Sequence, residues 1–395
     1  MGDAHSLAYC RKIMTFKPVN DRSTVVVVTN LARGGAQQIA LAFARHLETT
    51  NNLIDVLLLD PTRQALNEAK PFRVRGILGT IGHKLLYPVC IFALALRLRR
   101  SKPAIVLSTL LVANVVTLLA ARLAFGKRVL CVIRETTTIG ARSRRGGVLG
   151  RLLCQLAKWV YPLADAVIAP SEGVAQDLVG NLGLPRGKVH VLLNPTIDEG
   201  FHGRSVEKAA YRFQHETAGP LYVACGRLGP EKGYDVLLRA FADVHHRVAG
   251  ARLIIMGEGT LLAELQALAS ILGISAAVDF AGYVANPLPI IRQSNVFVLA
   301  SRWEGLPNAL IQALGCGTTP VATDCPSGPK EILEDGRYGY LVPVDDVPAL
   351  STAMVTAWQS PMPANVLKAR SEDFSEQRVF AQYETLVGNL MRGRV

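Results

Sequence analysis

The chain contains two successive series of short apolar runs, and a longer mixed segment separates each run from the next. The first run, TVVVVT at residues 24–29, is continuously β-branched. It is too short for a buried helix and suits a central strand of a parallel sheet. It leads into a Gly pair, after which Ile39, Phe43 and Leu47 follow at helical spacing. A strand, a glycine loop and a helix in this order indicate an α/β fold.

The same pattern recurs along the whole chain. The first series predicts further strands at residues 53–59, 104–107, 129–133, 166–169 and 189–193. The second series predicts strands at residues 221–224, 253–256, 278–281, 296–300, 320–323 and 340–342, with helices at 235–247 and 261–272 between them. Since 395 residues suffice for two domains, we expect an α/β protein with two Rossmann-like doubly wound domains that face each other across a cleft.

The domain boundaries follow from this division. Residues 1–22 are expected to be a flexible lead, residues 23–200 the first domain, residues 201–370 the second, and residues 371–395 a helix that closes the structure. Each series opens with a strand that runs into a Gly-containing loop. Ligands of doubly wound sheets bind at the carboxyl ends of the strands, so these two loops are expected to line the binding site.

The positive charge of the chain is concentrated in its first half. Residues 1–198 hold 26 Lys and Arg against 11 Asp and Glu, a net charge of +15, whereas the remainder carries −3. No acidic residue occurs from residue 69 to residue 134, or from residue 136 to residue 164. This asymmetry favours an anionic partner. We expect that partner to be a membrane surface and not a nucleic acid. A solvated basic surface without a specific partner is the alternative.

The location of the protein is predicted from its cysteines and its hydropathy. Seven scattered cysteines without a CxxC pair are typical of a reducing compartment. The first 22 residues lack an apolar signal core, and the charge-free stretch at residues 103–121 contains polar residues, which favours a buried strand running into a helix over a membrane span. We therefore expect a cytoplasmic protein that associates peripherally with the cytoplasmic face of the membrane.

Residues 297–324 carry the most informative motif. A predicted strand ends at Ser301, a short loop contains Glu304, and Pro307 opens a helix. The free amides of Asn308 and Ala309 would then form an anion site, and Glu304 could accept hydrogen bonds from sugar hydroxyls. Glu304 alone could equally be a helix N-terminal charge that the helix dipole favours.

The companion loop, CGRLGPEKG at residues 225–233, follows the first strand of the second series. Its Arg227 and Lys232 are five residues apart, and two fixed cations can stabilise the charge that develops on a diphosphate leaving group. Gly34 and Gly35 would let backbone approach the same diphosphate. Taken singly, each cation is more often solvated, and a Gly pair is more often only a turn.

Together these segments resemble glycosyltransferase family 4, which has the GT-B fold. The chain matches the family's G-R-x-x-x-x-K-G motif at residues 226–233 and resembles its interdomain NP-x-x-D segment at 194–198. The segments 256–259 and 280–284 resemble the nucleobase loops, and 327–333 resembles the last donor-domain motif. The resemblance implies a retaining transferase that uses a nucleotide-sugar without a cofactor, with a UDP-sugar as the first expectation and GDP-mannose as the second.

The resemblance also assigns roles to single residues. It implies catalytic roles for Glu304, Arg227 and Lys232. It assigns donor binding to the following residues: Gly34, Gly35, Gly226, Gly257, Gly259, Tyr283, Val284, Gly305, Leu306, Asn308, Ala309 and Gln312.

The chain departs from the family pattern at two positions. Gln312 replaces the second glutamate of the family's Glu-x7-Glu signature, which normally holds the ribose hydroxyls. An amide keeps one acceptor but loses a charge-assisted bond, so we expect altered nucleotide binding more than loss of chemistry. Many relatives carry a His after the strand at 129–133, where this chain has Arg134 and Glu135. Glu135 is a candidate acceptor-side residue; a capping or ion-paired role is the alternative.

The sequence predicts no metal site. It has no H-x-x-x-H, H-E-x-x-H or D-x-D triplet, so Arg227 and Lys232 are expected to replace a cation at the diphosphate. The expected acceptor is a lipid-linked saccharide or polysaccharide precursor. Residues 84–102 and 140–162 join apolar stretches to basic ends, and we expect each segment to contact the core on one side and lipid on the other.

Three other functions remain open on the sequence alone. Gln312 and the missing His suggest a non-catalytic nucleotide-binding relative or a subunit of a glycan-assembly complex. A two-domain solute-binding protein would share the bilobed architecture, and a nucleotide-sugar epimerase would use a related fold.

Overall fold

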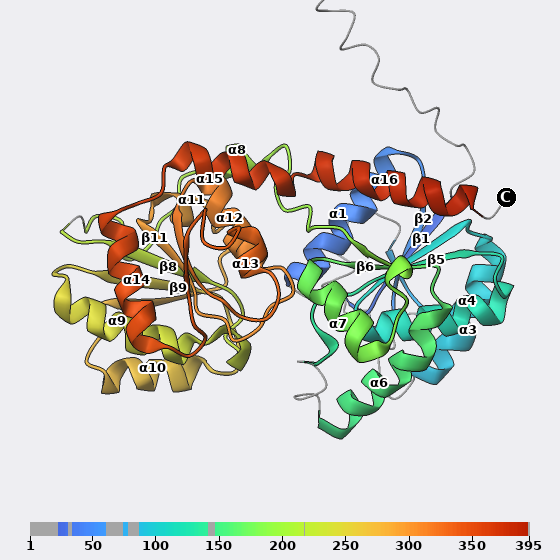
Figure 1. Cartoon of the computed structure of the whole chain (residues 1–395), viewed down its shortest axis with the longest axis horizontal. Helices are drawn as coiled ribbons and strands as arrows, with labels where there is room; N and C mark the ends of the chain where they lie inside the picture. The colour runs from blue at the N-terminus through green and yellow to red at the C-terminus, as the bar shows by residue number, and fades with distance from the viewer. Residues whose placement is uncertain are drawn as a thin grey trace, which may run out of the picture.

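The computed structural model describes residues 23–30, 34–60, 74–77, 87–140, 147–216 and 218–393. Within these residues the chain forms two parallel sheets, of seven and six strands, in two domains that lie side by side (Figure 1). This arrangement confirms the predicted fold class. The predicted flexible lead, residues 1–22, lies outside the described residues.

The first sheet has the strand order β3-β2-β1-β4-β5-β6-β7. Its strands are β1 (Thr24–Val28), β2 (Leu53–Leu58), β3 (Val74–Gly76), β4 (Ile105–Thr109), β5 (Leu130–Arg134), β6 (Ala166–Ala169) and β7 (Val189–Val191). The helices of this domain are α1 (Gly35–Thr49), α3 (Tyr87–Ser101), α4 (Leu111–Phe125), α6 (Gly147–Val160) and α7 (Glu172–Leu182). The short helices η3 (Tyr161–Leu163) and η4 (Arg186–Lys188) follow α6 and α7.

Helices cover both faces of this sheet. Residues of α3, α4, α6 and α7 pack on one face, and residues of α1 pack on the other. All five residues of β1 are consequently buried, which is why this strand is continuously β-branched rather than alternating.

The second sheet has the strand order β10-β9-β8-β11-β12-β13. Its strands are β8 (Leu221–Cys225), β9 (Arg252–Met256), β10 (Val278–Gly282), β11 (Val296–Leu299), β12 (Thr319–Thr323) and β13 (Tyr340–Val342). On one face pack α9 (Tyr234–Arg247), α10 (Leu262–Ile271) and α14 (Val347–Gln359). On the other pack α8 (Phe201–Ser205), α11 (Leu288–Gln293), α12 (Asn308–Cys316), α13 (Pro329–Ile332) and α15 (Ala364–Ser371).

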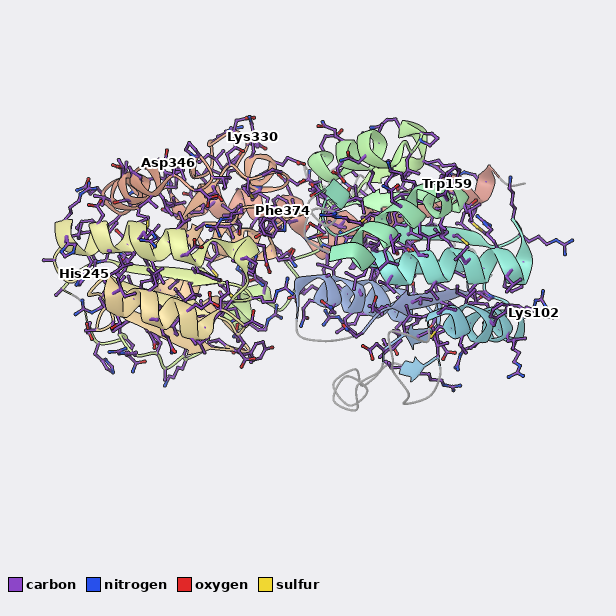
Figure 2. All side chains as sticks on the ribbon, turned by 90° about the horizontal axis from the view of Figure 1, so that it is seen from below. Lys102, Trp159, His245, Lys330, Asp346 and Phe374 are labelled. Carbon is purple, nitrogen blue, oxygen red and sulfur yellow. The ribbon has the colours of Figure 1, made fainter. Side chains whose placement is uncertain are left out.

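The chain crosses between the domains twice, and the two crossings are hydrogen-bonded to each other. The backbone amides of Thr196 and Ile197, after β7, donate to the carbonyl of Phe374 at 3.0 and 3.1 Å. Figure 2 labels Phe374 where the two domains meet, and it ends the short helix η6 (Glu372–Phe374). The crossings therefore form one double-stranded connection between the domains.

The last helix, α16 (Glu376–Arg392), returns to the first domain and lies along it (Figure 1). Phe380 and Tyr383 of α16 make edge-to-face contacts with Phe43 of α1, each with ring centroids 5.2 Å apart. His46 stacks on Phe380 and pairs with the Glu384 carboxylate at 3.0 Å. These contacts attach the C-terminus to the α1 face of the first sheet.

Three expectations from the sequence concern single elements. The stretch at residues 103–121 forms the buried strand β4 and the start of α4, as predicted. No described helix is both long enough and apolar enough to cross a membrane. Strand β3 was not predicted, because its three residues VRG form no apolar run.

Candidate active site

The site is built from the loops at the carboxyl ends of β8, β9 and β11. Two glycines hold the first two loops together: the Gly257 backbone has φ +147°, and a Cβ there would lie 1.9 Å from the carbonyl oxygen of Gly226. Only glycine permits this close approach. At Gly259 a Cβ would lie 2.3 Å from the Leu228 carbonyl oxygen, so the second loop lies directly against the first.

Lys232 and Glu304, from two of these loops, form the central ion pair. Lys232 Nζ lies 2.6 Å from Glu304 Oε1, and the two side chains are 16% and 13% exposed. The Ser301 hydroxyl donates to the same carboxylate oxygen at 2.6 Å. Burial alone would lower the pKa of Lys232, but the charge and hydrogen bond of Glu304 outweigh it, so this pKa is raised. Lys232 therefore keeps its proton in the neutral range.

Arg227 lies on the same loop as Lys232 but pairs with a different carboxylate. Its side chain is 75% exposed, and its guanidinium pairs with Glu231 at 2.7 Å. Glu231 lies within the matched G-R-x-x-x-x-K-G motif at a position that the motif leaves unspecified, so the sequence gives no signal for this pair. Of the three residues expected to be catalytic, the structure thus brings Lys232 and Glu304 into contact and leaves Arg227 at the surface of the loop.

The N-terminus of α12 forms the next wall. Pro307 precedes the helix, and Gly317 ends it in the left-handed conformation with φ +76°. The backbone amides at Asn308 and Ala309 stand at the N-terminal end, where an α-helix leaves its N–H groups free. Gln312 is half-buried one turn further along the same helix.

The remaining residues expected to bind the donor surround these loops. Leu306 is buried, and its carbonyl accepts a hydrogen bond from Asn194 Nδ2 at 3.0 Å. Tyr283 is 42% exposed after β10, and Val284 beside it packs partly against the core.

The first domain closely approaches these loops. A Cβ on Gly305 would lie 1.9 Å from the carbonyl oxygen of Thr136, and the Ser171 hydroxyl donates to the Gly305 carbonyl at 2.9 Å. At the start of α1, a Cβ on Gly35 would lie 3.3 Å from Asn308 Nδ2. Gly34 immediately precedes α1 as its N-cap. The segment after β5 and the start of α1 therefore lie against the loop after β11 and the start of α12.

A carboxylate of the second domain also caps a helix of the first. Glu331 of α13 accepts from the backbone amides of Glu172 and Gly173 at 2.7 and 3.0 Å. These amides belong to the first turn of α7, where a negative charge is favourable. The sequence does not reveal this role of Glu331, because the contact joins residues 159 positions apart.

Glu135 immediately precedes Thr136, whose carbonyl meets Gly305, but its side chain points into the interior network of the first domain. Its side chain is fully buried, and its carboxylate accepts hydrogen bonds from the Tyr161 hydroxyl and, at 3.2 Å, from Asn114 Nδ2. These hydrogen bonds place the carboxylate in an internal network, as a buried carboxylate requires; the acceptor-side role of Glu135 stays a prediction. Among the described residues, no group of three or more His, Cys, Asp and Glu side chains could hold a metal ion.

Two family models match the chain. One, described as Glycosyltransferase Family 4, matches residues 33–198, and the other, Glycosyl transferases group 1, matches residues 219–360. A Campylobacter jejuni protein, N-acetylgalactosamine-N,N'-diacetylbacillosaminyl-diphospho-undecaprenol 4-alpha-N-acetylgalactosaminyltransferase, is 31% identical over 56% of this chain and 58% of its own length. A Mycolicibacterium smegmatis GDP-mannose-dependent alpha-(1-6)-phosphatidylinositol monomannoside mannosyltransferase is 36% identical over 34% of this chain and 37% of its own length.

The similarity to both curated relatives thus spans less than two thirds of their length. Among solved structures, Anabaena HepE in complex with UDP superposes with a TM-score of 0.75 at 17% identity, covering 93% of this chain and all of that one. The matched models, the two parallel-sheet domains and this likeness agree: the chain belongs to glycosyltransferase family 4 and has the GT-B fold.

Proposed function

We propose that this protein is a retaining glycosyltransferase that moves a sugar from a nucleotide-sugar to a lipid-linked or polysaccharide-precursor acceptor. In this proposal the second domain binds the donor and the first receives the acceptor. The observation that carries it is the pair formed by Lys232 and Glu304, at 2.6 Å, beside the N-terminus of α12. A cation, a carboxylate and free helix amides suit a ligand that has a diphosphate at one end and sugar hydroxyls at the other.

The proposed chemistry separates charge between sugar and diphosphate. As the bond from the anomeric carbon to the diphosphate oxygen breaks, negative charge grows on the leaving group, and Lys232 and the α12 amides stabilise it. Arg227 would turn from Glu231 to the same diphosphate. Glu304 accepts hydrogen bonds from the sugar hydroxyls. The acceptor hydroxyl attacks the anomeric carbon on the face that the diphosphate leaves and gives its proton to the departing diphosphate oxygen, so the anomeric configuration is retained.

Turnover of a nucleotide-sugar panel tests this proposal. The purified chain would be incubated with UDP-sugars and with GDP-mannose, and released UDP or GDP would be measured. A UDP-sugar is the donor that we favour first. GDP-mannose is the second candidate, because the M. smegmatis relative is named as GDP-mannose-dependent. Release of UDP or GDP from at least one donor is expected. Nucleotide binding without release would instead support a non-catalytic relative, for which Gln312 is the motivating feature.

An apolar outer face of the first domain supports a membrane-associated acceptor. Helix α3 exposes Val89, Phe92 and Leu96, at spacings of three and four residues, and buries its opposite side in the core. Helix α6 likewise exposes a stripe, which comprises Leu152, Leu156 and Trp159. Both helices pack against α4 (Figure 1). We name these six residues the apolar face; Trp159 is labelled in Figure 2.

Exposed basic residues border the apolar face. Arg99, Arg100 and Lys102 stand at the end of α3, and Arg151 and Lys158 lie on α6. An apolar stripe beside Lys and Arg suits the interface of an anionic bilayer. The name of the C. jejuni relative specifies a diphospho-undecaprenol-linked substrate, which supports a lipid-linked acceptor here.

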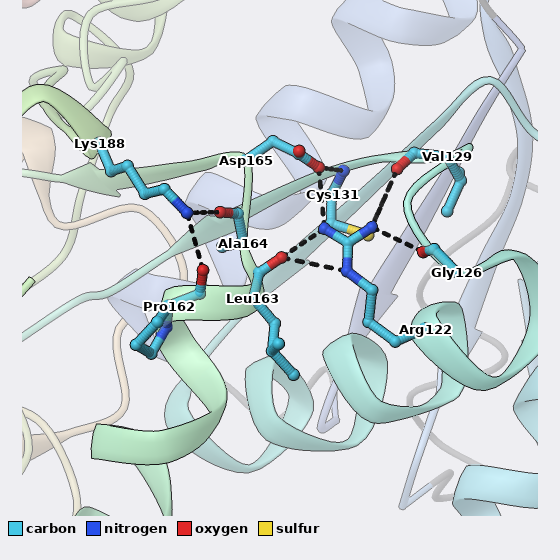
Figure 3. Close-up of polar contacts among 9 residues, drawn as sticks. All are labelled: Arg122, Gly126, Val129, Cys131, Pro162, Leu163, Ala164, Asp165 and Lys188. Atoms are coloured by element: carbon cyan, nitrogen blue, oxygen red, sulfur yellow. Dashed lines mark hydrogen bonds and ion pairs between the residues drawn. The ribbon is translucent and has the colours of Figure 1, made fainter.

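Not all basic residues of this domain are free to meet lipid. Arg122 donates to the Leu163 and Gly126 carbonyls and pairs with Asp165 at 3.1 Å, and Lys188 donates to the Pro162 and Ala164 carbonyls (Figure 3). These bonds fix the turn that follows α6. They hold the apolar stripe of α6 in place relative to α4 and the sheet.

Liposome flotation tests the membrane proposal. The chain should float with vesicles that contain anionic lipid and less with neutral ones, and Trp159→Glu combined with Phe92→Glu should abolish flotation. Ile271→Glu is a matched control, because Ile271 is 82% exposed on α10 of the other domain, as Trp159 is 81% exposed on α6. Equal flotation of both variants would contradict a role for the apolar face, and equal binding to both vesicle types would contradict the electrostatic contribution.

A further inference from the structure

Arg134, at the end of β5, is a buried cation without a carboxylate partner among the described residues. It is 3% exposed, its Nε has no hydrogen-bond partner in that part of the chain, and its guanidinium lies over the Phe43 ring at 5.8 Å. Burial lowers its pKa to about 10, so it remains charged at neutral pH. Its hydrogen bond runs from Nη2 to Asn194 Oδ1, at 2.6 Å.

This bond fixes the orientation of the Asn194 amide. A guanidinium can only donate, so Asn194 must turn its oxygen toward Arg134 and its NH2 group away. That NH2 group donates to the Leu306 carbonyl at 3.0 Å and to Asn308 Oδ1 at 2.5 Å. Both acceptors lie in the second domain, at the start of α12. Arg134 of the first sheet thus determines that the second domain meets the NH2 group of Asn194 and not its oxygen.

The orientation of the Asn308 amide follows in turn. Its Oδ1 is occupied by Asn194 Nδ2 and, at 3.3 Å, by the Thr196 hydroxyl. Its Nδ2 is therefore directed the other way, and it lies 3.3 Å from the position that a Cβ on Gly35 would take. The two hydrogens of this group consequently face the space between the N-terminus of α12 and the glycine loop of α1.

We propose that Arg134 and Asn194 are positioning residues, which orient Asn308 so that its Nδ2 donates a hydrogen bond to the diphosphate of the nucleotide-sugar. The inference rests on the proposed donor site. It adds one contact, from Asn308 to the diphosphate, in which residues of the first domain make the Asn308 amide a hydrogen-bond donor. Arg134 acts through Asn194 rather than on a ligand, since the cavity beside it measures about 10 Å³ and holds at most one water molecule.

The test is the Asn194→Asp substitution in the full chain. The introduced carboxylate would still accept from Arg134 but has no hydrogen to give to Asn308, so the Asn308 amide loses its fixed orientation. Affinity for UDP and for GDP is measured by calorimetry, with the thermal midpoint as the measure of folding. For the nucleotide that the wild type binds, we expect Asn194→Asp and Asn308→Ala each to weaken binding about tenfold, roughly the effect of one hydrogen bond to a charged group.

A double variant separates the proposed relay from a general loss of folding. If Asn194 acts through Asn308, Asn194→Asp should cause no further loss of affinity in an Asn308→Ala background. The Arg134→Lys variant should bind the nucleotide more tightly than the Arg134→Gln variant. A lysine can only donate and keeps the Asn194 oxygen turned toward it, whereas a glutamine can also accept. Wild-type affinity of Asn194→Asp, or multiplied losses in the double variant, would overturn the relay. A wild type that binds neither UDP nor GDP would overturn the proposed function itself.

Discussion

At the scale of single residues, the pairing of Lys232 with Glu304 decides which charges the site holds before a donor arrives. Each side chain is more than four-fifths shielded from solvent, so the loss of either one would leave the other as an uncompensated shielded group. The raised pKa of Lys232 means that this stabilisation is complete below the ordinary lysine value of 10.5 and is lost only as the pH rises through the higher folded value. Donor binding should therefore not reflect the titration of Lys232 between about pH 6 and pH 9.

Replacing Lys232 by Met should destabilise the fold by about 1–3 kcal/mol, because Glu304 then remains shielded and unpaired. Thermal or denaturant unfolding measures this loss. Adding Glu304→Gln to Lys232→Met removes the unpaired charge and should restore part of the stability. A double variant that is less stable than Lys232→Met would show that the two side chains do not depend on each other.

The sequence motif predicted that Lys232 and Glu304 belong to one site, because each follows a strand of the same parallel sheet. It did not predict that Glu231 would pair with Arg227, or that Asn194 would join Arg134 to Asn308. The first contact depends on side-chain geometry within one loop, and the contact of Asn194 with Asn308 depends on how the two domains approach each other; strand and helix patterns specify neither. The acceptor-side role of Glu135 stays a prediction. Its hydrogen bonds with Tyr161 and Asn114 could not be predicted, because these two residues come from other elements of the first domain.

At the scale of elements, strands were predictable wherever both faces of the sheet are covered. The buried strands β1 and β6 are nearly pure β-branched or small apolar runs, so their bounds were predicted to within one residue. Strand β3 at the sheet edge reads VRG, with an exposed arginine at its centre, and gave no such signal. Helix α16 was expected near the C-terminus, but its return to α1 could not be predicted from its own sequence.

His190, on the edge strand β7, should make the free energy of unfolding depend on pH. Burial and the nearby Arg186 lower the pKa of His190 from its ordinary value of 6.5. The unfolded chain therefore binds more protons near that pH, so the contribution of His190 is present above 6.5 and is lost as the pH falls through the folded pKa. Unfolding of wild type and His190→Gln, compared at about pH 5 and pH 8, should show a smaller loss at low pH in the variant; equal losses would contradict this.

At the scale of the whole molecule, activity should depend on close contact between the domains. Gly305 lies against the Thr136 carbonyl, where a Cβ would come within 1.9 Å. Gly305→Ala should separate the two walls of the site and reduce turnover on the order of 100-fold, as displacements near 1 Å do, while each sheet stays folded. Gly180→Ala, in α7 with nothing within 4 Å of its Cβ, is the matched control and should keep full activity. A fully active Gly305→Ala would mean that the approach is not needed for turnover.

The most direct test of the whole account is the turnover of Glu304→Gln. With the donor that the wild type cleaves, nucleotide release by this variant should fall about 10²–10³-fold, since the carboxylate that we propose to meet the sugar is gone. Glu264→Gln, an exposed glutamate on α10, serves as the control and should match the wild type. If Glu304→Gln releases nucleotide as fast as Glu264→Gln, the Lys232–Glu304 pair is not the catalytic centre and the assignment of the site is wrong.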